Sequence, residues 1–245
     1  MISKAQQSFK PMYAVAILAG GLATRLRPIT ETIPKALVDV AGEPFICRQL
    51  GYLQAQGFRR VVLCTGYLGE MIKEVVGDGT RFGLKVSYSN DGPVLLGTGG
   101  ALKQALSLLG DQFFVLYGDS FLPVDFEPIE RSFVDSKKAA LMTVFKNSDR
   151  WDKSNVFFRH GELLEYNKHA PRPEMAYIDY GLSVLTSRVL ETYPIGQAFD
   201  LADVYHELSL KGQLAGYLVR ERFYEIGSHQ GLKEAEDYFF TKEKA

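Results

Sequence analysis

The sequence Ala14-Val-Ala-Ile-Leu-Ala-Gly-Gly-Leu-Ala-Thr-Arg25 decides the fold and the first functional site of this chain. Its apolar part, 14–19, has the length of a strand, and the lack of alternating polar residues is typical of a strand buried on both faces of a parallel sheet. At Gly20-Gly21 the backbone is free to take positive φ and bring its N–H groups close to a ligand. Arg25 and Lys35 supply positive charge for a polyphosphate. The stretch therefore predicts a nucleoside triphosphate site at the end of a buried strand.

The composition is typical of a water-soluble α/β protein with one large or two small domains. The chain has 245 residues, of which 46% are hydrophobic and 23% charged, enough for a sizeable core. Because its net charge is only -1, it has no overall field that favours nucleic acid or an anionic membrane, and we expect neither as a partner. No run approaches the roughly 20 apolar residues of a membrane span.

The cysteines and the N-terminus bear on where the protein resides. Cys47 and Cys64 have no metal-binding spacing, and Cys64 lies in an apolar run, which favours a buried structural thiol. This pattern predicts a cytoplasmic protein. Residues 1–11 lack the apolar centre of a signal peptide and are interpreted as a loose extension.

Apolar runs alternate with helical patterns through the first half of the chain. Strands are expected at 13–19, 60–65, 84–89, 113–117 and 139–145, and helices from Glu43-Pro44 to Gly57, at 68–76 and at 99–109. Strands separated by helices of this length imply βαβ units and a doubly wound, mostly parallel sheet. Ligands of such sheets bind beyond the carboxyl ends of the strands. We therefore expect one rim to carry Gly20-Gly21, Thr65-Gly66 and Gly118-Asp119.

The second half of the chain has a different pattern, richer in strands. Strands are expected at 154–159, 161–166, 176–185 and 213–219, with a hairpin turn at Arg159–Glu162, and helical stretches at 187–192, 200–211 and 229–241. No low-complexity linker separates the halves. We therefore expect a single domain over 12–241, with a nucleotide-binding half at 12–120 and a substrate-binding half at 121–241.

Two segments at the expected rim have both a functional and a structural interpretation. Asp119 ends an apolar strand, where a carboxylate can hold Mg²⁺ or cap the next turn. Gly97–Gly100 opens a helix, where exposed N–H groups suit a base edge or an anion. A plain tight turn with Thr98 as the helix N-cap explains the same residues equally well.

Three further residues are open in the same way. Glu225 is either a second acid facing Asp119 or a surface charge. Ser228 has the position of an N-cap for the last helix. Lys168 stands at a strand end, and a lone lysine in such a place is usually solvated.

Together these segments resemble the sugar-1-phosphate nucleotidyltransferase family, over roughly residues 12–235. The family signature is an LAGG loop, a following arginine and a Pro-Lys pair, read here as Leu18-Ala-Gly-Gly21, Thr24-Arg25 and Pro34-Lys35. The resemblance implies a Rossmann-like α/β fold of the nucleotide-diphospho-sugar transferase type, with a smaller mixed β part that binds the sugar. It also implies nucleotide binding by Leu18, Ala19, Gly20, Gly21, Thr24, Arg25, Gly97, Thr98, Gly99 and Gly100, and sugar-phosphate binding by Asn155, Lys168, Asp179, Tyr180 and Gly181.

The reaction implied by the resemblance joins an NTP to a sugar 1-phosphate, giving an NDP-sugar and pyrophosphate with Mg²⁺ as cofactor. Because the attacking phosphate oxygen is already anionic, catalysis needs positioning and charge stabilisation rather than a general base. By this resemblance the catalytic residues are Arg25 and Lys35 on the triphosphate, Asp119 at the metal and Lys168 on the sugar phosphate, and Glu225 is the second metal ligand.

The sequence departs from the family pattern at three positions. Ala23 stands where the family often has a third loop glycine, which speaks against a positive φ there. Ala36 follows Lys35 in place of the usual proline, as in phosphocholine cytidylyltransferases. Glu225 replaces the common aspartate.

The substrates are less closely defined than the chemistry. The chain looks most like the short heptose- or mannose-1-phosphate guanylyltransferases, which implies GTP and a role in cell-surface polysaccharide synthesis. A uridylyltransferase for muramate or hexose 1-phosphate and a phosphocholine cytidylyltransferase stay open. So does a catalytically silent homologue that binds a nucleotide sugar and regulates a partner. We expect small-molecule substrates, and a homodimer is compatible with the sequence.

Overall fold

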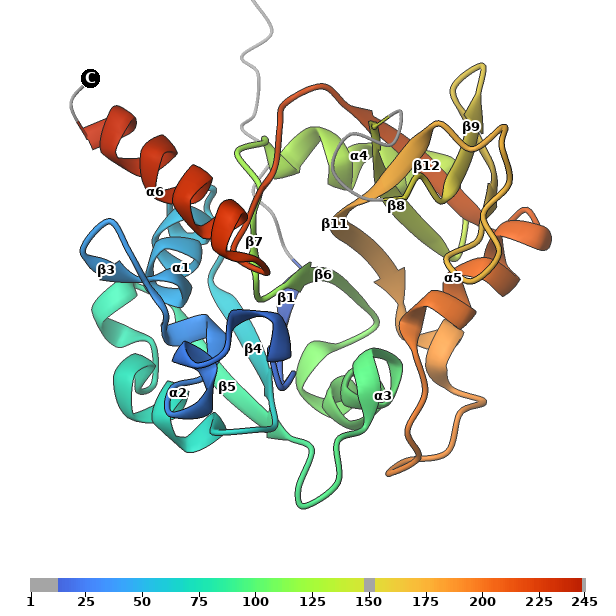
Figure 1. Cartoon of the computed structure of the whole chain (residues 1–245). Helices are drawn as coiled ribbons and strands as arrows, with labels where there is room; N and C mark the ends of the chain where they lie inside the picture. The colour runs from blue at the N-terminus through green and yellow to red at the C-terminus, as the bar shows by residue number, and fades with distance from the viewer. Residues whose placement is uncertain (1–12, 148–152, 244–245) are drawn as a thin grey trace, which may run out of the picture.

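The computed structural model describes residues 13–147 and 153–243, so the expected extension at 1–11 lies outside the described residues. Most of its strands join one large sheet (Figure 1). The strands of this sheet are β1 (Ala14–Ala19), β4 (Arg60–Thr65), β5 (Lys85–Asn90), β6 (Gln112–Tyr117), β8 (Ala140–Lys146), β9 (Val156–Arg159), β10 (Glu162–Tyr166), β11 (Tyr177–Thr186) and β12 (Leu214–Val219).

Helices and short elements complete the chain. The α-helices are α1 (Phe45–Ala55), α2 (Gly69–Val76), α3 (Gly97–Leu109), α4 (Phe126–Ser136), α5 (Leu201–Leu210) and α6 (His229–Glu243). The short strands are β2 (Asp39–Val40), β3 (Glu43–Pro44), β7 (Ser120–Phe121) and β13 (Tyr224–Glu225). The 3-10 turns are η1 (Thr24–Leu26), η2 (Ile29–Glu31), η3 (Lys35–Leu37), η4 (Thr80–Phe82) and η5 (Ser187–Leu190).

The centre of the sheet is parallel and doubly wound, as the sequence predicts. β1 pairs in parallel with β4 on one side and β6 on the other, and β4 pairs in parallel with β5. The chain runs outward from β1 to β4 and β5 and then crosses back to β6, so the winding reverses between β1 and β6. The carboxyl ends of strands at such a reversal form a crevice in open α/β sheets.

The second half extends the same sheet with mixed pairing. β11 is antiparallel to β6 and to β8, and β12 is parallel to β8. β9 and β10 form the expected hairpin, with Glu162 opposite Arg159 and positive φ at His160 and Gly161. Residues 187–192 were expected to be helical, and the structure has only the short 3-10 turn η5 there.

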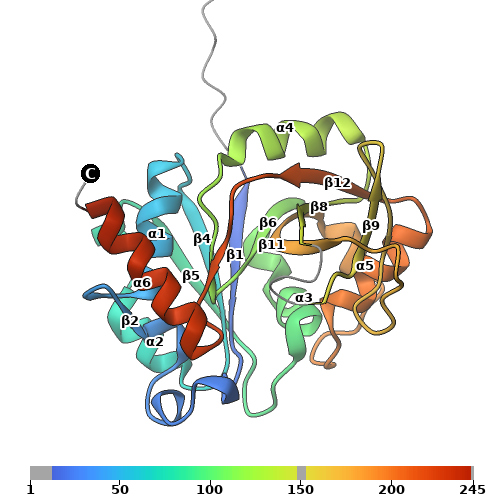
Figure 2. The same ribbon diagram turned by 45° about the horizontal axis from the view of Figure 1, so that its top comes forward.

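The core lies on both faces of the sheet because successive side chains of β1 point to opposite sides. Val15 and Ile17 join one cluster with residues of α1, α2 and α4, and Ala14 and Ala16 join another with residues of α3 and α5. A smaller cluster holds α6 against α1 and β7, and α6 lies beside α1 at the left of Figure 1. Figure 2 shows α4 lying along β12. Among the described residues, no helix has the length and apolar character that crossing a bilayer requires.

A tight contact joins the ends of β1 and β6. The Gly118 N–H donates to the Leu18 carbonyl at 3.0 Å, and a Cβ at Gly118 would lie only 2.6 Å from that oxygen. Gly118 is therefore required here by the close approach of two backbones.

We expect Gly118→Ala to lower the free energy of unfolding by about 1–3 kcal/mol, because the added methyl group would push the two strand ends apart. Gly51→Ala in α1 is the control, since a Cβ there would meet nothing within 4 Å. Alanine in the helix should raise the free energy of unfolding by about 0.5–1 kcal/mol. Urea denaturation measures both changes, and a stabilised Gly118→Ala variant would contradict the contact.

Candidate active site

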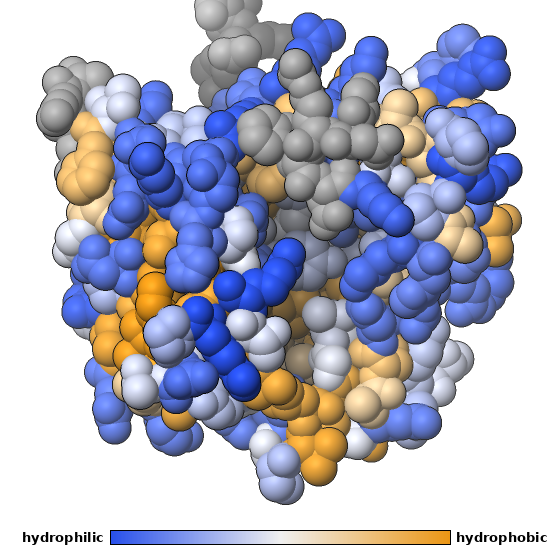
Figure 3. Space-filling model, viewed as in Figure 1, coloured by the Kyte–Doolittle hydropathy of each residue, from blue (hydrophilic) through white to orange (hydrophobic). Residues whose placement is uncertain are grey.

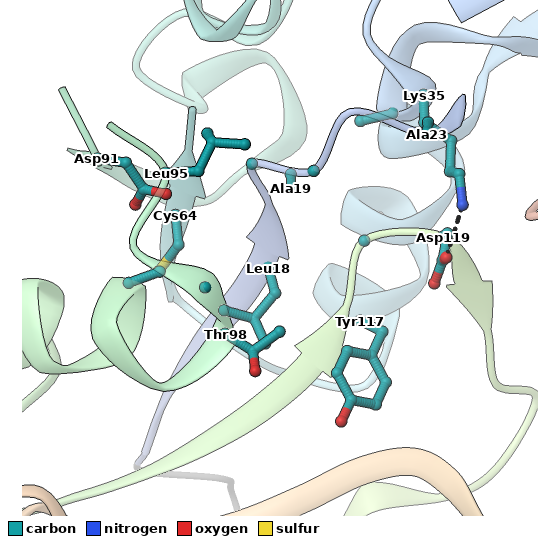
Figure 4. Close-up of a pocket in the computed structure, with 16 residues that line it drawn as sticks. Leu18, Ala19, Ala23, Lys35, Cys64, Asp91, Leu95, Thr98, Tyr117 and Asp119 are labelled. Atoms are coloured by element: carbon teal, nitrogen blue, oxygen red, sulfur yellow. Dashed lines mark hydrogen bonds and ion pairs between the residues drawn. The ribbon is translucent and has the colours of Figure 1, made fainter. Parts of the chain in front are cut away.

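A cavity of about 260 Å³ opens at the reversal between β1 and β6. Figure 3 shows the hollow at the centre of this face of the molecule, and Figure 4 shows its wall. Gly118 and Asp119 line it, as expected for the rim of the sheet, and Gly66 approaches the wall closely, since a Cβ at Gly20 would lie 3.1 Å from the Gly66 nitrogen. Of the predicted nucleotide-binding residues, those in the wall are Leu18, Ala19, Gly20, Gly21, Gly97 and Thr98.

The loop after β1 carries the predicted triphosphate ligands. Ala23 has φ 50 and ψ 43, so the expectation against a positive φ at this position is wrong. The Thr30 hydroxyl donates to the Ala23 carbonyl at 2.8 Å and holds the loop in this shape. Thr24 and Arg25 follow in η1, exposed and outside the cavity wall. No hydrogen bond or ion pair within 13–147 and 153–243 engages the Arg25 guanidinium, which leaves it free to meet a ligand.

Asp119 is held in place by its neighbours in the turn between β6 and β7. Lys35 Nζ lies 2.8 Å from Asp119 Oδ2, and the Ser120 hydroxyl donates to Asp119 Oδ1 at 3.2 Å. Gln49 of α1 is 2% exposed and donates to the Tyr117 and Ser120 carbonyls at 3.0 and 2.8 Å, which fixes the turn on both sides. The carboxylate therefore faces a lysine at the cavity rather than a helix start.

Glu225 is brought beside Asp119 by a short strand pair. β13 is antiparallel to β7, with Glu225 opposite Ser120. The Ile226 N–H donates to the Asp119 carbonyl at 2.9 Å. Two acids that are 106 positions apart in sequence, 225 minus 119, thus lie at one strand pair, Glu225 in β13 and Asp119 directly before β7.

The Glu225 carboxylate also shapes the start of the last helix. It accepts hydrogen bonds from the Gly227 N–H and from the Ser228 hydroxyl. The Ser228 hydroxyl in turn accepts from the Gly231 N–H at 3.0 Å, so Ser228 caps α6 as expected. Glu225 is therefore neither an isolated surface charge nor a side chain directed only at a ligand.

The chemistry of this corner fits a magnesium ion. Asp119 is one-third exposed, at 33%, and offers oxygen ligands. A Cβ at Gly227 would lie within 2.3 Å of Glu225 Oε2 and 3.4 Å of Lys35 Nζ, so the second carboxylate lies close to the Lys35–Asp119 pair. No group of three or more His, Cys, Asp or Glu side chains suited to a metal occurs among the described residues. A site with three or more protein ligands is not required, since Mg²⁺ is usually held by one or two carboxylates plus substrate phosphates.

Three of the predicted sugar-phosphate residues, Asn155, Asp179 and Gly181, meet at a bulge in β11. The Asp179 N–H donates to Asn155 Oδ1 at 3.2 Å, the Tyr117 hydroxyl donates to Asp179 Oδ2 at 3.3 Å, and the Gly181 N–H donates to Asp179 Oδ1 at 2.9 Å. Burial raises the pKa of Asp179 to about 6, although the hydrogen bonds from Gly181 and Tyr117 and the charge of Lys168 act in the opposite direction. A carboxyl group of this kind accepts or donates hydrogen bonds to sugar hydroxyls near neutral pH.

Lys168 is connected to the nucleotide side of the cavity. Its Nζ lies 2.9 Å from Asp200 Oδ2, and the Thr98 hydroxyl donates to Asp200 Oδ1 at 2.7 Å. The same hydroxyl accepts from the Leu201 N–H at the start of α5. The N-cap of α3 is Leu96, so the alternative of Thr98 as the cap of its own helix is wrong. Asp200 thus joins Thr98, in the cavity wall, to the lysine predicted to hold the sugar phosphate.

Gly99, Gly100 and Tyr180 are outside the cavity wall and pack against other parts of the fold. The N–H groups of Gly99 and Gly100 donate to the Phe199 carbonyl at 3.0 and 3.4 Å, and a Cβ at Gly99 would overlap the Phe199 ring at 2.2 Å. Tyr180 is 1% exposed, and its ring packs against Phe223 in the core. Their roles in ligand binding stay predictions.

Asp91, Tyr117 and Asp200 take part in the site and were not singled out from the sequence. Asp91 and Tyr117 follow or end parallel strands, so the rule of carboxyl ends would have found them. Asp200 is the N-cap of α5, and an acid before a helix is a common cap signal. Cys64 is 1% exposed and a free thiol, as predicted, and lies in the cavity wall.

Comparison with known proteins identifies the family. The sequence profile described as "Nucleotidyl transferase" matches residues 14–160. The chain belongs to this family. Over 211 residues, this nucleotidyl transferase is 29% identical to the D-glycero-alpha-D-manno-heptose 1-phosphate guanylyltransferase of Campylobacter jejuni, a match that covers 86% of this chain and 93% of that protein. It is 43% identical over 111 residues to the N-acetylmuramate alpha-1-phosphate uridylyltransferase of Neisseria meningitidis, covering 45% of this chain and 48% of that protein.

Solved structures of similar fold agree with the sequence match. HddC from Yersinia pseudotuberculosis, crystallised with GMP-PN, superposes on the nucleotidyl transferase with a TM-score of 0.76 at 26% identity, covering 93% of this chain and 100% of HddC. A putative glucose-1-phosphate thymidylyltransferase from Bacillus anthracis has a TM-score of 0.81 at 23% identity, covering 92% and 94% of the two chains, and shows the fold alone. The expected nucleotide-diphospho-sugar transferase fold is confirmed.

The free energy of unfolding of the wild type should fall as the pH rises, and Asp179→Asn should abolish this dependence. Because the pKa of the folded state, about 6, lies above the reference value of 3.8, the folded protein binds a proton that the unfolded chain releases. This stability is present below about pH 4 and is lost as the pH rises through about 6, by up to roughly 3 kcal/mol. Urea unfolding of both proteins at about pH 4 and about pH 7 measures it. Parallel pH dependences would contradict a raised pKa.

Proposed function

We propose that this nucleotidyl transferase joins GTP to heptose 1-phosphate or mannose 1-phosphate and releases pyrophosphate. The observation that carries the proposal is that one cavity wall holds both the Lys35–Asp119 pair and Thr98, whose hydroxyl is bonded to Asp200 and, through it, to Lys168. Lys35 thus lies in the wall of a cavity with room for a nucleotide, and Lys168 lies beyond Thr98, on the far side of Asp200. A heptose-1-phosphate guanylyltransferase and a mannose-1-phosphate guanylyltransferase each match 86% of this chain, which supports these substrates.

The residues supply positioning and charge, which is what this reaction requires. Arg25 and Lys35 bind the triphosphate and stabilise the charge that accumulates on the departing pyrophosphate. Lys168 orients the sugar phosphate, whose anionic oxygen attacks the α-phosphorus in line, and no general base is needed. When bound by Asp119 and Glu225, Mg²⁺ supplies further charge neutralisation on the phosphates.

The alternatives have less support. The N-acetylmuramate alpha-1-phosphate uridylyltransferase relative matches only 45% of this chain, and the phosphocholine alternative rests on Ala36. A silent regulatory homologue is disfavoured by the presence of Arg25, Lys35, Asp119 and Lys168 together. The free thiols and the need for cellular NTP favour a cytoplasmic enzyme of nucleotide-sugar synthesis that serves cell-surface polysaccharide.

The test is pyrophosphate release from GTP, UTP, CTP and dTTP, each combined with a panel of sugar 1-phosphates and phosphocholine in the presence of Mg²⁺. We expect GTP with heptose 1-phosphate or mannose 1-phosphate to be the best pair. UTP with muramate 1-phosphate would keep the reaction and overturn the substrates. Binding of nucleotide sugar by calorimetry without turnover in any well would overturn the enzyme in favour of the regulatory homologue.

Arg25→Ala should lower kcat/KM by roughly 100- to 1,000-fold, because it removes a cation from the transition-state charge. Arg27→Ala is the matched control. The Arg27 side chain is 57% exposed and faces Glu31 at 3.9 Å, so its loss should change kcat/KM by about twofold or less. Steady-state pyrophosphate release measures both variants. Equal losses in the two would show that only general charge matters.

Asp119→Asn should abolish turnover at saturating Mg²⁺ while leaving the protein folded. The amide keeps the size of the side chain but removes the charge that faces Lys35 and suits a cation. Turnover and thermal unfolding are measured on the same preparation. Near-normal kcat/KM at low Mg²⁺ would remove Asp119 from the metal site.

A further inference from the structure

The cavity has two chemically different ends. In Figure 4, Asp91 and Leu95 lie on one side of the loop after β1, and Lys35 and Asp119 lie on the other. The second end carries the cation suited to phosphates. The first end is lined by apolar side chains, among them Cys64, and has the single carboxylate of Asp91. A nucleotide that places its phosphates at the lysine therefore extends its base toward Asp91.

The position of Asp91 is fixed by the backbone. It directly follows β5, and its N–H donates to the Thr65 carbonyl at the end of β4 at 2.9 Å. Its Oδ2 accepts from the Leu96 N–H at 3.0 Å, which closes the loop before α3. Among the described residues no hydrogen bond engages Oδ1, so one carboxylate oxygen and the remaining lone pair of the other are available to a ligand.

The surroundings of Asp91 favour a ligand that donates hydrogen bonds. No lysine, arginine or histidine within the described part of the chain forms an ion pair with it, and burial raises its pKa, opposed by the Leu96 N–H. A partly buried carboxylate without a cation gains from any N–H donors that reach it. A carbonyl oxygen placed at the same point would be repelled.

Only one of the common bases presents two adjacent donors without an acceptor between them. Guanine has its N1–H beside its N2 amino group, which matches the two oxygens of a carboxylate. Uracil and thymine offer one N–H flanked by carbonyl groups, and cytosine and adenine offer an amino group beside a ring nitrogen that accepts. We propose that Asp91 selects the base, with its carboxylate accepting from the N1–H and N2 amino edge of guanine. This assignment rests on the proposed function and names the residue that determines its nucleotide.

The test is Asp91→Asn with GTP and XTP. Asparagine keeps an oxygen for the Leu96 N–H and turns its amide NH₂ toward the cavity, where it opposes the guanine amino group but donates to the C2 carbonyl of xanthine. We expect GTP affinity and kcat/KM to fall about 10- to 100-fold, the value of one bidentate base contact, and those for XTP to rise above the wild-type values. A merely structural role of Asp91 would weaken both nucleotides equally.

Asp78→Asn is the matched control, because Asp78 is also a loop acid that accepts a backbone N–H, from Thr80, but lies exposed and outside the cavity wall. Its GTP and XTP affinities should equal those of the wild type. Calorimetry of Mg-GTP and Mg-XTP binding tests the base contact without turnover, so failure of the proposed reaction leaves this readout intact. Unchanged GTP affinity in Asp91→Asn, a parallel loss of both nucleotides, or a wild type that prefers UTP would each overturn the inference.

Discussion

The contact between the ends of β1 and β6 is the constraint on which the site depends. The 3.0 Å hydrogen bond from Gly118 to the Leu18 carbonyl brings two parallel strands together at the point where the winding of the sheet reverses. From there one backbone turns into the glycine loop and the other into the turn that carries Asp119. The buried Gln49 amide secures that turn from the helix beneath it. Because the two strand ends are in contact, the chain that leads on to Lys35 and the turn that carries Asp119 come together.

The two halves of the chain share their polar groups rather than meeting as separate units. Asp200 caps α5, pairs with Lys168 and accepts from Thr98, so one carboxylate joins a helix start to the residues predicted to bind the sugar phosphate and the nucleotide. Tyr117, at the end of a nucleotide-half strand, donates to Asp179 in the other half. Because each of these two acids is bonded to residues of both halves, a ligand that changes the hydrogen bonds in one half also changes those in the other.

Local pattern was sufficient for the elements whose environment is itself local. The unbroken apolar run of β1 and the turn at His160-Gly161 follow from side-chain character and glycine preference, and both were predicted correctly. Asp119 was placed at the rim because strand direction alone determines it. Helix α4 was not predicted, although Phe126, Ile129 and Phe133 have helical spacing. Pro128 speaks against a helix by residue type, but it lies in the first turn, where proline is tolerated.

The remaining details depend on contacts distant in sequence. Ala23 takes a left-handed conformation, which costs about 1–2 kcal/mol, because the Thr30 hydroxyl and the loop around it hold its carbonyl. The Thr98 hydroxyl accepts from the Leu201 N–H at the start of α5 rather than from its own helix, because Asp200 is adjacent in space. The Phe199 ring packs against Gly99 where a Cβ would not fit, and nothing in the sequence near either residue indicates this contact. Side-chain partners of this kind follow from the assembled fold alone.

The last helix has a consequence for how variants of this protein are read. Ser228 and Glu225 tie the first turn of α6 to the corner that holds Asp119, while Ala235 and Phe239 anchor the helix body in a separate apolar cluster far along its length. The helix therefore connects that cluster to the acid. In a random mutational screen, substitutions at these buried apolar positions will therefore lower activity together with stability. Distance from the cavity is a poor guide to which positions matter.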